Sequence, residues 1–149
     1  MRHLSNQELI DIFDGTSGKC HLCHKRLAWK NYGVPNARGA WHVDHSRPRQ
    51  RGGSDYRRNL KPACIKCNCS KRDGSTRTYR SRHGKTRAPL SREHRRHAQF
   101  WNGVGFGGLG WLAGRALFGP GPAILAGLLG LALGSSADPD ETNGSDEWW

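Results

Sequence analysis

The chain has 149 residues and a formal net charge of +12 at neutral pH. This length predicts one small domain with extensions. The positive charge is concentrated, because residues 1–97 carry 23 Lys and Arg against 7 Asp and Glu. So basic a segment predicts a polyanionic partner, and a surface kept charged for solubility is the alternative.

The expected compartment follows from the N-terminal residues and the cysteines. Residues 1–8 contain no apolar run, so they do not resemble a secretory signal. Four of the five cysteines lie in closely spaced pairs. This spacing favours a reducing cytoplasm over a disulfide scaffold.

Hydrophobic spacing predicts a few short elements in chain order. Residues 4–13 predict an amphipathic helix with Ser5 or its neighbour as the cap. Residues 40–45 predict a strand, which the following proline and glycines end. Residues 65–72 predict a second short helix, and a further helix is expected over 91–100.

The cysteine pairs predict a metal site. Cys20 and Cys23, like Cys64 and Cys67, have the C-x-x-C spacing that places two thiolates on one zinc ion. Four thiolates leave no open coordination position, so this zinc is expected to be structural. Two unrelated reduced pairs are the alternative. The fifth cysteine, Cys69, is expected to be a packed or idle thiol.

Between and after these pairs the chain carries a further motif. Its parts are Asp44-His45, Gly52-Gly53, Asn59-Leu60, Cys67-Asn68 and Lys71. In the order D-H, G-G, N-L, C-x-x-C-N and K, the motif resembles the HNH endonucleases over roughly residues 20 to 73. The resemblance implies a ββα-metal finger. It also implies an H-N-N variant, because Asn68 stands where many members carry His.

The resemblance implies a role for each polar residue of the motif. His45 is expected to be the general base that activates water, and an ordinary imidazole pKa of about 6.5 suits that role. Asp44 and Asn68 are expected to hold a divalent cation, and their oxygens favour Mg²⁺ or Mn²⁺. Asn59 is expected to hold the loop and orient the imidazole. Neighbours on a strand point to opposite faces, so the strand must twist or end here for Asp44 and His45 to face one phosphate.

Basic side chains surround the motif, and DNA is the partner that the resemblance implies, with RNA left open. Contacts from such side chains to phosphates give affinity without reading base sequence, so low sequence specificity is expected. The residues expected to bind nucleic acid are Arg47, Arg49, Arg51, Arg57, Arg58, Lys61, Lys66 and Lys71.

The composition changes abruptly near residue 98. Residues 98–134 hold 11 glycines and a single charged side chain, Arg115. Small residues four apart would let helices pack closely in lipid or between copies of the chain, as a glycine zipper. A two-pass hairpin looks too short, since residues 123–134 would form a helix of only about 18 Å. A single tilted span from about Leu109, or a re-entrant hairpin, is therefore expected. A self-associating tail or a helix pair packed on a soluble domain is the alternative.

The expected fold class is α+β, a small zinc-stabilised ββα-metal domain with a basic linker and a Gly-rich apolar helical C-terminal segment. The expected parts are an HNH nuclease domain with its N-terminal helix, a basic linker, a Gly-rich apolar segment expected to associate with a membrane, and an acidic disordered tail. Their bounds are 1–75, 76–97, 98–134 and 135–149.

The expected function is metal-dependent hydrolysis of DNA phosphodiester bonds. The basic stretch before the apolar segment would keep the nuclease in the cytoplasm, at the inner face of the cell membrane. The alternative is a non-catalytic, zinc-dependent nucleic-acid-binding module anchored by its C-terminal segment. A membrane structural protein with a degenerate nuclease head is a third hypothesis.

Overall fold

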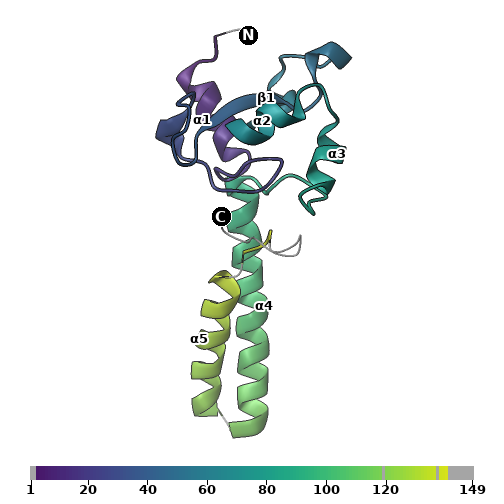
Figure 1. Ribbon diagram of the computed structural model, residues 1–149. Helices are drawn as coiled ribbons and strands as arrows, with labels where there is room; N and C mark the ends of the chain where they lie inside the picture. Colours follow the sequence, from purple (N-terminus) through teal and green to yellow (C-terminus); the bar gives the residue numbers. More distant parts are fainter. Residues whose placement is uncertain (1–2, 119, 137, 141–149) are drawn as a thin grey trace. The chain divides into compact units, whose positions relative to one another are not determined.

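The computed structural model describes residues 3–118, 120–136 and 138–140. Their contacts separate a first unit, which ends at Arg92, from a second unit, Glu93–Asp140. The first unit contains a two-stranded sheet, short helices and a cysteine cluster, and the second is helical. The predicted α+β fold class is therefore confirmed (Figure 1).

Helix α1 (Asn6–Asp14) begins where the sequence predicted. The Ser5 hydroxyl accepts a hydrogen bond from the Glu8 amide at 3.2 Å, and the Glu8 carboxylate accepts one from the Ser5 amide at 2.9 Å. Such a capping box satisfies two amides that a helix N-terminus otherwise leaves unpaired. The helix buries Ile12 and Phe13 against the rest of the unit.

The sheet and the helix that follows it form the expected ββα order. Strands β1 (Trp41–His45) and β2 (Leu60–Cys64) pair antiparallel along their whole length, and α2 (Ile65–Lys71) begins directly after β2. The sequence predicted β1 and α2, but β2 was implied only by the family resemblance. Pro62 interrupts its strand-forming composition, and the sheet tolerates this proline because neither of its two strands is central. The Pro62 carbonyl accepts from the His21 amide at 2.9 Å.

The core of the first unit is built around Trp41. Its side chain is completely buried, and the rings of Phe13, Trp29 and Tyr32 lie 5.1, 6.0 and 4.8 Å from it between centroids. The indole N–H donates to the Ala28 carbonyl at 3.1 Å, so the one polar atom of the ring is satisfied. This cluster fastens α1 and the segment before β1 to the sheet.

The loop between the strands requires both of its glycines. Gly52 has a φ of +73°, a backbone angle that residues other than glycine rarely adopt. A Cβ at Gly53 would overlap the Arg47 carbonyl oxygen, because the loop folds back on itself there. The loop contains two 3-10 turns, η2 (Arg49–Arg51) and η3 (Arg57–Asn59), and a third turn, η1 (Trp29–Asn31), precedes β1.

The segment predicted as a basic linker is partly structured. Residues 76–92 belong to the first unit, and they include helix α3 (Thr76–Ser81). Polar contacts attach this helix, because the Thr76 hydroxyl donates to the Ser46 carbonyl at 2.5 Å and Arg80 Nε donates to the His21 carbonyl at 2.7 Å. A lack of aliphatic residues therefore did not prevent docking, since hydrogen bonds replace apolar burial.

The second unit contains two long helices, α4 (Arg92–Phe118) and α5 (Pro120–Ser136). The expected continuous span from Leu109 is wrong, because α4 ends at Phe118 and a new helix begins at Pro120. Proline fits the first turn of a helix and is excluded from the interior of one. None of the described helices combines the length and the apolar character that crossing a membrane requires.

Glycines lie where α4 and α5 approach each other. A Cβ at Gly110 would overlap the Ala126 carbonyl oxygen, and one at Gly130 would overlap the Phe106 carbonyl oxygen. The helices run side by side in opposite directions (Figure 1). The small-residue spacing noted in the sequence therefore brings two helices of the same chain into backbone contact.

Gly130→Ala is expected to loosen this helix pair, and Gly105→Ala is the matched control. The first methyl group meets a backbone oxygen, which predicts a loss of about 1–3 kcal/mol in stability. The second meets nothing within 4 Å, so its helix propensity raises stability by up to about 1 kcal/mol. Urea unfolding followed by helical circular dichroism measures both. If Gly130→Ala and Gly105→Ala changed the free energy of unfolding equally, the helices would not approach each other at Gly130.

Candidate metal centre and nuclease site

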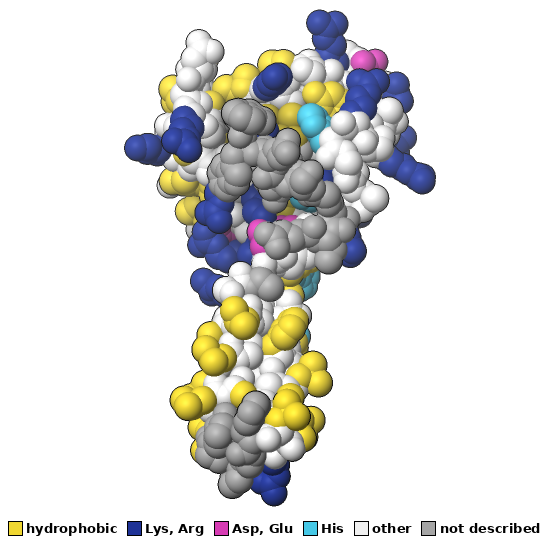
Figure 2. Space-filling model, turned by 60° about the horizontal axis from the view of Figure 1, so that its bottom comes forward, with side chains coloured by type: hydrophobic (Ala, Val, Ile, Leu, Met, Phe, Trp, Pro, Cys, Tyr) yellow, Lys and Arg dark blue, Asp and Glu magenta, His cyan; other side chains and the backbone are white. Residues whose placement is uncertain are grey.

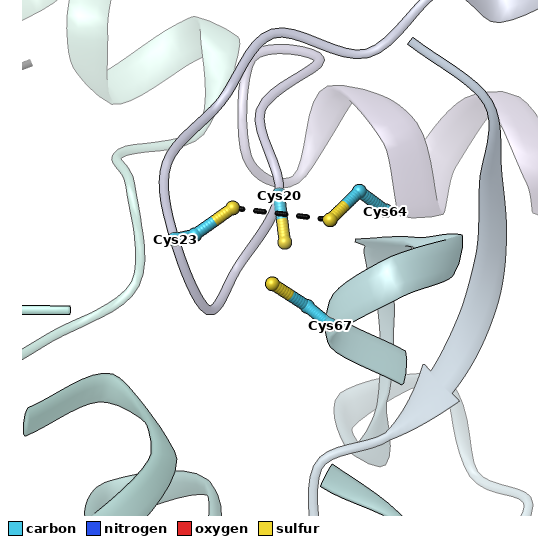
Figure 3. Close-up of side chains that lie close together, drawn as sticks. All are labelled: Cys20, Cys23, Cys64 and Cys67. Atoms are coloured by element: carbon cyan, nitrogen blue, oxygen red, sulfur yellow. Dashed lines mark hydrogen bonds between the residues drawn. The ribbon is translucent and has the colours of Figure 1, made fainter. Parts of the chain in front are cut away.

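Four cysteine sulfurs converge in the first unit (Figure 3). Cys20 and Cys23 come from the turn after α1, Cys64 from the end of β2, and Cys67 from α2. All four Sγ atoms lie within 4.8 Å of one another, and those of Cys23 and Cys64 are 3.9 Å apart. A tetrahedron with Zn–S distances of about 2.3 Å has edges of about 3.8 Å. The four residues therefore fit a structural zinc ion.

Burial makes the Cys20 thiol depend on a cation. Cys20 has no exposed surface, and burial raises the pKa of its thiol well above the usual value. Without a metal, this thiol therefore stays protonated at neutral pH. Zinc binds thiolates, so its binding releases protons and contributes directly to folding.

A buried polar network connects the cysteine turn to the strand. His21, which lies between the two cysteines of the turn, donates from Nε2 to Asp44 Oδ2 at 2.8 Å. Lys71 donates from Nζ to Asp44 Oδ1 at 3.0 Å and to the His45 carbonyl at 2.8 Å. The exposed fractions of His21, Asp44 and Lys71 are 0%, 5% and 3%. One carboxylate therefore joins the turn, β1 and α2.

His21 is neutral in this network. Burial lowers its pKa, and the effect of burial exceeds that of the hydrogen bond to Asp44. Arg80 Nη2 lies 3.2 Å from His21 Nδ1 and can only donate, which assigns the ring proton to Nε2. The single negative charge of Asp44 is then balanced by the single positive charge of Lys71.

These contacts bear on two predicted roles. Asp44, predicted to hold the catalytic cation, has both carboxylate oxygens engaged by His21 and Lys71. A divalent cation would have to replace the ammonium of Lys71, so the donor set does not fit such a cation as it stands. Lys71, predicted to bind nucleic acid, instead has its ammonium buried on Asp44 and the His45 carbonyl.

His45 is the last residue of β1, and its side chain contacts other residues than the Asp44 side chain does. His45 Nε2 lies 2.6 Å from Asp55 Oδ1, and the His45 side chain is 10% exposed. The strand continues through both residues, so their side chains lie on opposite faces. The structure does not bring these two predicted site residues together.

Asp55 was not among the residues predicted from the sequence. Arg49 holds it with two nitrogens, Nη2 lying 2.6 Å from Oδ2 and Nε 2.9 Å from Oδ1. First Arg49 and then His45 lower the pKa of the Asp55 carboxyl, so it is ionised at neutral pH. The available signal was a lone acid in an arginine-rich loop, ten residues after the motif histidine.

Asn59 holds the loop between the strands. Its Oδ1 accepts from the Arg47 amide at 2.7 Å, and its Nδ2 donates to the Arg47 and Ser54 carbonyls at 3.0 and 2.8 Å. These are the contacts of a residue that fixes loop shape. Within the described parts of the chain, Asn59 makes no hydrogen bond to the His45 imidazole.

Asn68, the other predicted cation ligand, lies on α2 and is half-buried. Among the described residues its side chain makes no hydrogen bond, either to Asp44 or to His45. The amide is therefore available for a ligand, but this structure does not join it to the other two predicted site residues.

An open cleft of about 730 Å³ begins at Ser46, directly after His45. The loop glycines and Asn59 line part of it, so backbone approaches the cleft closely there. Arginine side chains give the cleft a positive lining, which suits a phosphate backbone. They are Arg47, Arg51, Arg58 and Arg77, of which Arg77 was not predicted.

The other predicted nucleic-acid-binding residues differ in their surroundings. Arg49 is paired with Asp55, and Arg57 lies 3.6 Å from the carboxylate of Asp11. Lys61 is half-buried, whereas Lys66 is exposed. The visible face of the first unit carries Lys and Arg side chains, drawn in dark blue in Figure 2.

Comparison with known proteins agrees with this geometry. A family model described as HNH endonuclease matches residues 20–74, which span the cysteine turn, both strands and α2. Residues 20–74 are an HNH domain. Searches of curated proteins and of solved structures found no match to the chain. The HNH domain covers about a third of the sequence, and the second unit lies outside it.

Cys64→Ser is expected to abolish stoichiometric zinc binding and to unfold the HNH domain. Zinc binding at such sites contributes about 10–16 kcal/mol, far more than a small domain can lose. Cys69→Ser is the matched control, because Cys69 is exposed and outside the cluster. Zinc content and circular dichroism of the purified proteins measure the effect. Full zinc occupancy in Cys64→Ser would contradict a four-sulfur site.

Proposed function

We propose that this chain is a metal-dependent HNH endonuclease that hydrolyses DNA phosphodiester bonds. The observation that carries the proposal is the position of His45, at the end of β1 and next to the first residue of an arginine-lined cleft. The cleft offers positive charge to a phosphate, and the histidine offers a base.

The proposed chemistry uses these residues directly. The imidazole of His45 takes a proton from water as the water oxygen bonds to phosphorus and the bond to the leaving oxygen breaks. The leaving oxygen then takes up a proton. Arg47 and Arg51 would hold the phosphate and balance charge on its oxygens. No base-reading element is part of the proposal, so cleavage is expected at many sequences.

A divalent cation, Mg²⁺ or Mn²⁺, belongs to the proposal because the family motif includes Asp44 and Asn68. When bound, such an ion would neutralise charge on the phosphate. Its binding at Asp44 requires the Lys71 ammonium to move away first. For this reason metal dependence is tested directly.

The non-catalytic alternative also depends on the contact between Lys71 and Asp44. If Lys71 stays on Asp44, the domain keeps a basic cleft without a place for the cation and would bind nucleic acid without cutting it. Both hypotheses predict DNA binding that weakens with salt. They differ in cleavage.

His45→Ala is expected to abolish Mg²⁺- or Mn²⁺-dependent nicking of plasmid DNA while salt-sensitive binding persists. General base catalysis raises a rate by about 10²–10⁴-fold, so the nicking rate of the variant should be at least about 10²-fold below that of the wild type. His42→Ala is the control, since His42 lies on the same strand but is not part of the family motif. Gel electrophoresis with the metals and with EDTA measures nicking. Binding by the wild type without any cleavage would favour the non-catalytic module.

We further propose that the second unit attaches the nuclease to the inner face of the cell membrane. Leucines cover the outside of the helix pair, and Leu109, Leu125 and Leu133 are 67%, 66% and 69% exposed. Hydrophobic side chains are spread over its visible face, drawn in yellow in Figure 2. A helix that is apolar on all sides is normally buried in protein or lipid. The proposed form is a hairpin of α4 and α5 that dips into one leaflet.

Vesicle flotation tests this attachment. The full chain is expected to float with vesicles that contain phosphatidylglycerol, whereas a Leu125→Lys and Leu129→Lys variant should remain in the dense fractions. Each lysine at the centre of a bilayer costs about 2.5–3.5 kcal/mol. If the full chain does not float with the vesicles and sediments as a defined oligomer, other copies of the chain cover the leucines instead.

A further inference from the structure

We propose that Asp55 positions the catalytic histidine, holding the His45 Nε2–H so that Nδ1 is the atom that removes the proton from water. The proposal rests on the nuclease function proposed above and specifies how its base works. Nothing in the family motif carries this role, since Asp55 lies in the loop between the motif glycines and Asn59.

The distance between the two side chains assigns the ring proton. His45 Nε2 and Asp55 Oδ1 are 2.6 Å apart, which is a short, charge-assisted hydrogen bond. An ionised carboxylate can only accept hydrogen bonds, so the proton must lie on Nε2. In a neutral imidazole the lone pair is then on Nδ1. Nδ1 is therefore the only basic atom of the ring.

Arg49 also approaches Nε2 and must be reconciled with this assignment. Its Nε lies 3.3 Å from His45 Nε2, and as a donor it would require a lone pair there. The same Nε lies closer to Asp55 Oδ1, at 2.9 Å, and Nη2 makes two further contacts of 2.7 and 2.6 Å with that carboxylate. Arg49 therefore donates its hydrogen bonds to the Asp55 carboxylate, and the imidazole also donates to that carboxylate.

The carboxylate is fixed from two sides. The two-pronged contact with Arg49 sets its orientation, and the loop that carries it is held by the Asn59 amide on the carbonyl of Ser54, the preceding residue. Asp55 is 40% exposed, so this rigidity comes from hydrogen bonds and not from burial. A base whose second nitrogen is held in this way reaches its substrate in one orientation.

The contact also suits the product of proton transfer. When Nδ1 takes the proton, the ring becomes an imidazolium with an N–H on each nitrogen. The Nε2–H then faces a carboxylate, so the new positive charge lies beside a negative one. Arg49 holds the pKa of that carboxyl below its usual value, which favours the ionised form.

The competing interpretation is that Nε2 is the base and Asp55 blocks it until DNA displaces the carboxylate. The two interpretations predict opposite effects of removing the carboxylate. Asp55→Ala lowers the rate if Asp55 positions the ring and raises it if Asp55 blocks the ring.

The first experiment observes the ring proton without any DNA. In the zinc-loaded full chain at about pH 8, where an ordinary histidine is neutral, proton NMR should show a far-downfield ring N–H signal that correlates with His45 Nε2. His45→Gln assigns the signal. Asp55→Ala should lose it, because the proton then exchanges with water, and Asp73→Ala should keep it, because Asp73 is an exposed acid outside this contact. A signal on Nδ1, or none in the wild type, overturns the proposal.

The second experiment separates positioning from binding. Asp55→Ala is expected to lower kcat for plasmid nicking by at least about tenfold, a part of the about 10²–10⁴-fold that general base catalysis supplies, with KM unchanged. Asp55→Asn keeps an oxygen that can accept the Nε2–H and should lose less. Asp73→Ala should nick at the wild-type rate. A rate for Asp55→Ala equal to or above that of the wild type overturns the proposal.

The two readouts also separate failure of this inference from failure of the proposed function. A wild type that shows the Nε2–H signal but never nicks DNA refutes the nuclease and leaves the histidine–carboxylate contact in place. A wild type that nicks DNA with an unchanged Asp55→Ala rate refutes only the inference. If Asp55→Ala loses its zinc or its fold, the NMR signal and kcat of Asp55→Asn decide, since that variant preserves side-chain shape.

Discussion

The buried carboxylate of Asp44 is the interaction on which the HNH domain depends. It receives the His21 imidazole from the cysteine turn and the Lys71 ammonium from α2, so it joins β1 to two parts of the finger that the zinc site also joins. Removing one partner of such a buried pair costs about 3–5 kcal/mol, because the other charge is then left without compensation. Zinc and this network therefore reinforce each other. The metal fixes where the elements meet, and the network fixes their orientation.

The alternation of a strand explains why neighbouring motif residues have separate tasks. Because Asp44 faces the interior on β1, His45 faces the other side, where Arg49 and Asp55 of the loop contact its ring. Lys71 connects the two sides, since its ammonium contacts the carboxylate of one residue and the carbonyl of the next. A change at the Asp44 carboxylate that displaces Lys71 would therefore also alter the hydrogen bond to the backbone of His45, the proposed base.

Local sequence patterns were enough for much of the finger, and contacts between distant residues account for the rest. Cysteine spacing, a cap at Ser5 and the alternation of apolar and polar residues around Val43 each predict structure from adjacent residues. The role of Lys71 was not predictable in this way, because an exposed and a buried lysine look alike until the partner, 27 positions earlier, is known. Asp55 was missed for the same reason. Its importance comes from a ring ten residues away, brought close by a loop whose shape depends on Gly53 and Asn59.

The two units solve the problem of a small core in different ways. The HNH domain has too few apolar residues for its size and relies on a metal site and on polar contacts such as that between Asp44 and Lys71. The helix pair has apolar residues in excess and uses glycines to bring its backbones together, which leaves its leucines on the outside. Water is a poor solvent for that surface, while the basic finger favours water and polyanions. A chain with both therefore favours a boundary where lipid and nucleic acid are each within reach, and this physical preference is why the proposed attachment and the proposed nuclease belong to one hypothesis.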